Sequence, residues 1–162
     1  QIYRIPLLPI SIFSWTNTVS GNWSAEGNWT NEYNVVWAPV SAGQSNYVLN
    51  FNEAGTYTAT HDLGTTFLLN QLNFGGPVLT LEGTSLFFTA NGGTIPQVNQ
   101  NSDADVTIGS ILKIILPRIA LSLAGSSPPR YCCISMLSKI SITPMTRSSL
   151  EMSGVARIEF GT

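Results

Sequence analysis

The chain contains few residues that could perform chemistry, and they are scattered along the sequence. Its one histidine, His61, is followed directly by Asp62, and a His–carboxylate pair is a common acid–base arrangement. The alternating stretch TYTATHDL around the pair predicts a strand, in which neighbouring side chains point to opposite faces. The two residues are therefore not expected to form a dyad, and His61 is predicted to be a packed or hydrogen-bonded structural residue.

The acidic residues do not predict a metal site or a glycosidase pair. Asp103 and Asp105 in NSDADVT would share one face of an extended segment and offer oxygen ligands suited to Ca²⁺. No glycine-rich calcium repeat surrounds them, which favours a turn with solvated carboxylates. Four further acidic residues are too dispersed to predict a catalytic pairing, namely Glu26, Glu32, Glu53 and Glu82. Since G-x-S-x-G, H-E-x-x-H and phosphate-loop motifs are also missing, we expect no enzymatic activity, no cofactor and no metal.

The two cysteines, Cys132 and Cys133, are adjacent. Neighbouring cysteines rarely bridge each other, because the small ring strains the disulfide. They are interpreted as two small buried or half-buried residues, with a bond to another chain as the alternative. A zinc site would need more ligands than one histidine can add.

The tryptophans are concentrated in one short stretch. All four fall between Phe13 and Trp37, namely Trp15, Trp23, Trp29 and Trp37. Large rings suit the packing of a core or cap, and a flat ring with a polar edge also suits stacking on a sugar. The tripeptides NWS at 22–24 and NWT at 28–30 match the N-glycosylation acceptor pattern, which makes Asn22 and Asn28 possible glycosylation sites.

Composition places the chain among β-rich domains. Its 162 residues suffice for one domain with a real core. Only 10% are charged, against about a quarter in a typical protein, and Ser, Thr, Asn and Gly fill the difference. The net charge of −2 and the lack of Lys or Arg between residues 5 and 112 argue against a nucleic-acid partner. No apolar run of about 18 residues predicts a membrane span.

Two segments are distinguished, an apolar arm at 1–12 and a single β domain at 13–162. The domain divides into a Trp-rich cap region at 13–45, strand repeats at 46–112 and a more basic set of strands at 113–162 that holds six of the seven Lys and Arg residues. The arm could lie along a sheet edge of a neighbouring subunit, or it could pack on its own domain. Its candidate contact residues are Ile2, Tyr3, Ile5, Leu7, Leu8, Ile10 and Ile12.

Short strands between turns are predicted along the whole middle of the chain. The strand-sized stretches are NYVLNF, TYTATHDL, TFLLNQLNF, PVLTLEG, SLFFTA and ADVTIGSILKIIL. Tyr47, Leu49 and Phe51 are expected to share one face, as are Tyr57, Ala59 and His61. Because tight two-residue hairpins are missing between these strands, we favour a parallel β-solenoid (β-helix), with a β-sandwich as the alternative.

The stretch FSWTNTVSGNWSAEGNWTNEYNVVW and the residues after it resemble the start of bacterial autotransporter-type, β-strand-repeat surface proteins. The matching pieces are Trp15-Thr16, Gly21 to Trp23, Gly27 to Trp29, Pro39 to Phe51, Leu72 to Gly75 and Leu79 to Gly83, within residues 13–110. The resemblance implies a right-handed parallel β-solenoid outside a cell, with the tryptophans covering its first coil and no catalytic residues. After Ser110 the sequence departs from the pattern, either as a diverged closing segment or through a shifted reading frame or uncertain sequence assignment.

These observations favour a non-enzymatic extracellular structural protein. It would be a cell-surface passenger fragment or the subunit of a fibre, and it would self-associate into filaments by exchange of a strand or of the arm. A carbohydrate-binding module that uses exposed Trp and Asn side chains to bind glycans is the alternative.

Overall fold

The computed structural model describes residues 7–76, 78–102 and 104–109, together with the backbone of short strands between residues 112 and 152. The described residues form strands, turns and one short 3₁₀ turn, η1 (Glu26–Asn28). The predicted all-β class is therefore confirmed. Ile2, Tyr3, Ile5, Asp103 and Cys133 lie outside the described residues.

The strands follow one another at short intervals. Their bounds are β1 (Ser11–Trp15), β2 (Gly21–Asn22), β3 (Trp29–Asn31), β4 (Tyr47–Phe51), β5 (Thr56–His61), β6 (Phe67–Leu69), β7 (Gln71–Phe74), β8 (Val78–Gly83), β9 (Leu86–Phe88), β10 (Gln97–Gln100), β11 (Val106–Ile108), β12 (Leu112–Ile114), β13 (Ile119–Ser122), β14 (Arg130–Cys132), β15 (Ile140–Ile142) and β16 (Glu151–Met152).

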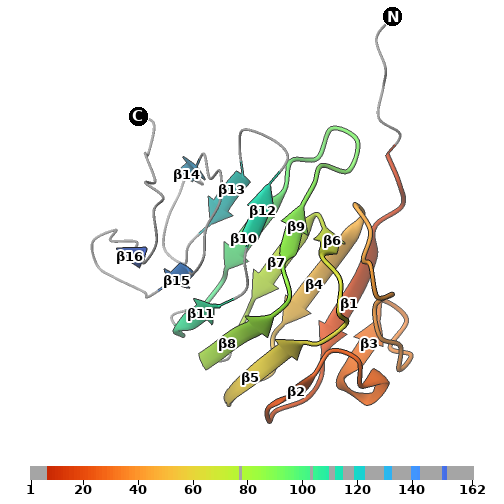
Figure 1. Ribbon diagram of the computed structural model, residues 1–162, viewed down its shortest axis with the longest axis vertical. Helices are drawn as coiled ribbons and strands as arrows, with labels where there is room; N and C mark the ends of the chain where they lie inside the picture. Colours follow the sequence, from red (N-terminus) through yellow and green to blue (C-terminus); the bar gives the residue numbers. More distant parts are fainter. Residues whose placement is uncertain are drawn as a thin grey trace, which may run out of the picture.

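The strands build three sheets in which parallel neighbours are three strands apart in the chain. The seven-stranded sheet has the order β14-β13-β10-β7-β4-β1-β3, the six-stranded sheet β16-β15-β11-β8-β5-β2, and the three-stranded sheet β12-β9-β6. Within the seven-stranded sheet β1, β4, β7, β10 and β13 pair in parallel, as do β2, β5, β8 and β11 in the six-stranded sheet and β6, β9 and β12 in the third. The strands β3, β14, β15 and β16 pair antiparallel. From β4 to β12 the chain therefore visits the three sheets in turn, and Figure 1 shows the strand colours following the sequence across each sheet.

The core lies between the sheets and is built from columns of apolar side chains in register. On the seven-stranded sheet Trp15, Phe51 and Phe74 are aligned, and beside them Phe13, Leu49 and Leu72. All six are buried. Since burial of one such side chain stabilises the fold by roughly 1.5–3 kcal/mol, the columns hold successive strands in this register.

A row of polar side chains occupies the opposite, half-buried face of the same sheet. Ser14, Asn50, Asn73 and Asn99 are aligned in successive strands. The Asn73 amide donates to Asn50 Oδ1 at 2.7 Å, and the Asn99 amide donates to Asn73 Oδ1 at 2.8 Å. This amide ladder gives the outer face its own hydrogen bonds between strands, in addition to those of the backbone.

Two glycines allow the chain to pass close to a neighbouring strand. Gly43 (φ +62°) pairs with Leu68, and Gly83 (φ +107°) pairs with His61 at the end of β5 and β8. A Cβ atom at either glycine would meet the backbone of its partner. Both positions therefore require glycine for conformation and for space.

Several predicted boundaries differ from the observed ones. Ser11 and Ile12, assigned to the arm, are part of β1. The stretch TFLLNQLNF forms two strands, β6 and β7, because Asn70 turns the chain between two sheets. The strand β10 was not predicted, since its sequence QVNQ is mostly polar. Its Asn99 belongs to the amide ladder, Gln97 lies on the same half-buried face, and only Val98 and Gln100 are buried.

Candidate functional site

The most distinctive cluster of side chains is formed by Trp15, Trp23 and Trp29 at the N-terminal edge of the sheets. Trp29 packs edge-on against the other two, with ring centroids 5.1 Å from Trp15 and 5.3 Å from Trp23. All three rings are at most 1% exposed. Burial leaves them no free ring face, so the predicted role in sugar stacking is not open to these three residues, and packing in a core or cap remains.

The strands and turns that precede β4 position this tryptophan cluster. Trp15 ends β1, Trp29 begins β3, and the two strands are antiparallel with these residues opposite each other. The indole N–H of Trp15 donates to the Asn17 carbonyl at 2.7 Å, and that of Trp29 donates to the Trp23 carbonyl at 3.1 Å. The indole N–H of Trp23 is buried and has no hydrogen-bond partner among the described residues.

His61 completes the cluster from β5. Its ring is 1% exposed and stacks on Trp23 at a centroid distance of 4.7 Å, with Phe67 edge-on at 5.4 Å. Neither ring nitrogen forms a hydrogen bond within the described part of the chain. Burial lowers the pKa of His61, although the nearby Thr65 backbone and Asp62 carboxylate oppose that shift. The imidazole is therefore held as a neutral packing group.

Asp62 points away from His61 and fastens the loop that carries Trp23. Its two carboxylate oxygens accept hydrogen bonds from the backbone N–H and the hydroxyl of Ser24. Desolvation, the largest single influence, would raise the pKa of Asp62, but the bonds from Ser24, with the Asp62 backbone and His61, together lower it. The backbone N–H of Trp23 also donates to the Thr60 carbonyl at 2.9 Å. The expectation that His61 and Asp62 lie on opposite faces agrees with this arrangement, in which His61 is buried and Asp62 is exposed.

The fourth tryptophan, Trp37, has a side chain that is 59% exposed, unlike the three rings of the cluster. It belongs to a β-hairpin that comprises β3, a turn at Asn34 (φ +57°) and residues 35–37, called hairpin 29–37 below. The Trp37 N–H donates to the Trp29 carbonyl at 3.2 Å, and the Asn31 N–H donates to the Val35 carbonyl at 2.9 Å. Of the four tryptophans, only Trp37 keeps a ring surface that a ligand could reach.

The two possible glycosylation sites differ in their surroundings. The side chain of Asn22 is exposed at the end of β2. Asn28 is half-buried, and its amide donates to the Asn22 carbonyl at 2.9 Å while its carbonyl oxygen accepts from Asn17 at 3.0 Å. Because a glycan is attached through the amide nitrogen, modification of Asn28 would break a bond that fixes the loop, whereas Asn22 is accessible.

The described part of the arm is bound to its own chain. The amide of buried Asn91 exchanges two hydrogen bonds of 2.8 Å with the backbone N–H and carbonyl of Leu8. The amide of Asn46, also buried, donates to the Pro9 carbonyl. The side chains of Leu7, Leu8 and Ile10 nevertheless remain exposed, and Ile12 is half-buried in β1. Of the two positions predicted for the arm, residues 7–12 therefore adopt the one on their own domain.

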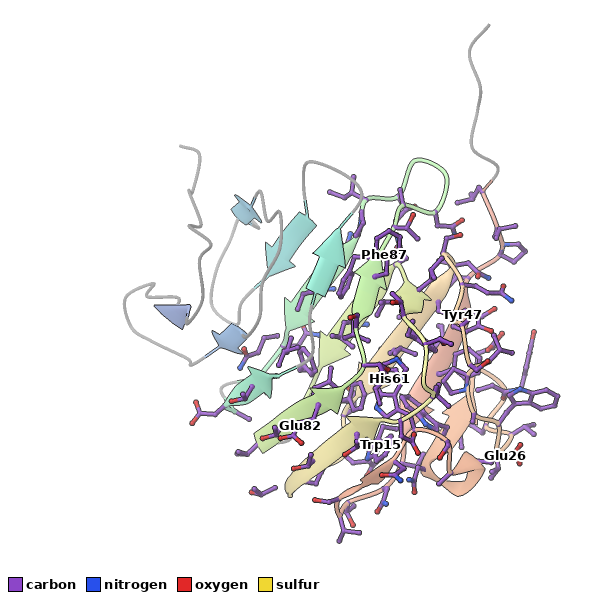
Figure 2. The ribbon with its side chains drawn as sticks, viewed as in Figure 1. Trp15, Glu26, Tyr47, His61, Glu82 and Phe87 are labelled. Carbon is purple, nitrogen blue, oxygen red and sulfur yellow. The ribbon has the colours of Figure 1, made fainter. Side chains whose placement is uncertain are left out.

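The dispersed acidic residues do not converge on a site. Glu26, Glu32 and Glu82 are exposed, and Figure 2 shows Glu26 and Glu82 on separate parts of the molecule. Among the described residues, no three His, Cys, Asp or Glu side chains lie close enough together to hold a metal ion. The described residues also include no helix with the length and apolar character needed to cross a membrane.

Sequence reasoning missed two groups of residues that organise this end of the molecule. The buried amides of Asn46 and Asn91 fix the arm, and an Asn in a polar turn gives no signal for burial. The exposed side chains of Tyr33, Val35 and Val36 flank Trp37. Their signal was present, because NVVW is an apolar run beside a turn residue.

No family model matches the chain, and comparison with curated proteins and with solved structures gives no significant match.

Proposed function

We propose that the chain is a non-enzymatic extracellular structural protein, either a cell-surface passenger fragment or the subunit of a fibre. In this proposal the three sheets are the faces of a parallel β-solenoid, and the tryptophan cluster covers its first coil. The observation that carries the proposal is the parallel pairing of strands three apart in all three sheets. Such a chain grows by adding coils, and each coil contacts only its neighbours.

The surface and the interior support this proposal in different ways. The amide ladder and the apolar columns both align residues of successive strands, from β1 through β4 and β7 to β10. The few ionisable groups are dispersed, and the buried His61 is surrounded by aromatic rings. An extracellular location rests on the low charge, the abundance of Asn and Thr, and the resemblance to bacterial surface proteins.

Electron microscopy of the protein from its native source tests the structural role. Filaments with a regular subunit repeat are expected, whereas single compact particles at all concentrations would contradict the fibre form of the proposal.

A chain that lacks residues 1–10 tests the arm without removing a strand of the fold, because β1 begins only at Ser11. Loss of filaments with unchanged circular dichroism would support arm exchange, and filaments that persist would exclude it.

A carbohydrate-binding module is the second candidate, and the exposure of Trp37 is the observation that favours it. A glycan that stacks on this ring would shift the tryptophan emission and quench part of it. The test is a fluorescence titration with a panel of polysaccharides, compared with the Trp37→Ala variant. A spectrum that no glycan changes, or a change that persists in the variant, would exclude this candidate.

A further inference from the structure

The exposed apolar surface of the molecule is concentrated on two neighbouring segments. Among the described residues, eight of the ten large exposed apolar side chains fall in residues 7–10 and 33–40, namely Leu7, Leu8, Ile10, Tyr33, Val35, Val36, Trp37 and Val40. The two segments are held next to each other, because residues 7–10 lead into β1, residues 33–40 follow β3, and these two strands pair. In addition, the Ile12 N–H donates to Glu32 Oε2 at 3.3 Å. An apolar surface grouped in this way is typical of an interaction site.

Hairpin 29–37 presents a backbone edge as well as apolar side chains. In this hairpin the backbone hydrogen bonds join Asn31 to Val35 and Trp29 to Trp37. Thr30 and Val36, which lie opposite each other between these two bonds, are therefore a non-hydrogen-bonded pair. In such a pair the N–H and carbonyl of each residue point away from the partner strand. The backbone of Val36 therefore faces outward from β3, at the outermost position of the seven-stranded sheet.

We propose that this edge is a self-association surface, on which residues 35–37 of a second copy pair antiparallel about a two-fold axis at Val36. Around that axis, Val36 of each copy donates its N–H to the Val36 carbonyl of the other. The seven-stranded sheets of the two molecules then join edge to edge. The contact is isologous, so it closes as a dimer and does not by itself propagate into a filament.

Charge and area both favour a second copy as the occupant. Glu32 is the one charged residue of hairpin 29–37, and it lies beside the turn, where it accepts from the Ile12 N–H. No charged residue falls in 7–25 or in 33–52, so the outward strand 35–37 carries no charge that would repel a second copy or attract an ionic partner. Tyr33 and Trp37 are 77% and 59% exposed. Since a full aromatic side chain has an area of about 150–250 Å², their combined solvent-exposed area is roughly 250 Å². With the six aliphatic neighbours the total is on the order of 800 Å², the contribution of each partner to a standard interface.

This inference rests on the proposed structural role for the expectation of self-association, and it adds the surface and the symmetry. The test is sedimentation equilibrium of the chain between about 1 and 200 µM, with tryptophan emission recorded on the same samples. We expect a reversible monomer–dimer equilibrium with a blue shift of the Trp37 contribution in the dimer. Trp15, Trp23 and Trp29 are buried in the monomer and should not contribute to that shift.

Two variants address the edge and one serves as a control. Val36→Pro removes the outward N–H, and Val36→Lys places a charge at the axis, while both leave the bonds of residues 35 and 37 to β3 in place. Each should weaken the dimer at least tenfold with unchanged circular dichroism. Val78→Lys changes an exposed valine of β8 in the six-stranded sheet and should leave the dimer intact.

A chain that stays monomeric at every concentration would overturn the inference, and so would a dimer that persists in both Val36 variants. A monomer whose Trp37 emission shifts only on addition of a polysaccharide would overturn it in favour of a glycan site. Filaments that both Val36 variants still form would overturn the inference and leave the structural role standing. A dimer that Val36→Pro dissociates, without filaments under any condition, would support the inference and count against the fibre.

Discussion

Acid should destabilise this protein through a single residue, His61. The imidazole packs against Trp23 and Phe67, neither of its nitrogens bonds to a residue that the structure describes, and burial lowers its pKa below the usual value of 6.5. As the pH falls below 6.5, the unfolded chain binds a proton at this position while the folded chain does not. The free energy of unfolding therefore decreases, and it continues to decrease until the pH reaches the lower pKa of the folded state.

The magnitude follows from linkage. One proton taken up by the unfolded state alone lowers the free energy of unfolding by up to about 1.4 kcal/mol per pH unit. No other histidine titrates in this pH range, because His61 is the only histidine of the chain, and the pKa of Asp62 is lowered from 3.8. Asp62 therefore stays ionised throughout this range, and its own contribution is lost only in stronger acid.

Urea denaturation followed by tryptophan fluorescence between pH 7.5 and pH 5 measures this effect. We expect the midpoint to fall with acid at a constant m-value, since compactness of the end states should not change. The matched control is His61→Phe, which keeps an aromatic ring against Trp23 but cannot bind a proton. Its midpoint should be the same at both pH values, whatever its absolute stability.

Two results would refute this reasoning. Equal stability of the wild-type chain at pH 7.5 and pH 5 would mean that the imidazole gains compensating contacts when it is charged. A higher stability at pH 5 would mean that the faces of the surrounding rings stabilise the imidazolium by more than burial destabilises it. A slope that persists in His61→Phe would assign the effect to another group.

Three further predictions concern stability. Trp29→Ala should lower the free energy of unfolding by about 3–5 kcal/mol, whereas Trp37→Ala should change it by about 0.5 kcal/mol or less, as measured by urea denaturation followed by circular dichroism; similar losses would contradict the assigned burial. Asn91→Ala should remove both bonds to the arm, lower stability by about 1–3 kcal/mol and speed hydrogen exchange of the Leu8 N–H; unchanged exchange would show that the arm is held otherwise. Gly83→Ala should lower the melting temperature markedly, because a Cβ there meets the His61 backbone, while Gly93→Ala, which meets no atom within 4 Å, is the control; equal shifts would contradict the close approach.

The strands were predictable where one face is apolar. In β5 the alternation that places Tyr57 and Ala59 on one side is strict enough to identify both the strand and its buried face. In β4 Tyr47, Leu49 and Phe51 identify the strand and one buried face, although Val48 between them is buried as well. In β10 the signal failed, because only Val98 is apolar and the neighbouring amides are used by the ladder. Polar residues that bond to the same residue type in the next strand cannot be recognised as a strand from one segment alone.

The tryptophans show a different limit of sequence reasoning. The stretch from Phe13 to Trp37 identified the region correctly, but it could not separate three buried rings from an exposed one. That difference depends on pairing, since Trp29 lies between β1 and the outer strand of the hairpin, while Trp37 belongs to that outer strand. The buried position of His61 was predicted from alternation, whereas its contact with Trp23 depends on a loop whose path the residue types do not determine.

The parallel stacking also determines how the molecule would carry a mechanical load. Because β1, β4, β7 and β10 bond in this order, tension applied across the seven-stranded sheet, from β1 towards β10, acts along the hydrogen bonds and not across them. The ladders between β1, β4, β7 and β10 are therefore loaded in series, and the weakest opens first. Force should therefore unfold the chain in steps, and each step should release the residues between one strand of this sheet and the next. Between β4 and β10 the side-chain bonds of the amide ladder must also break at every step.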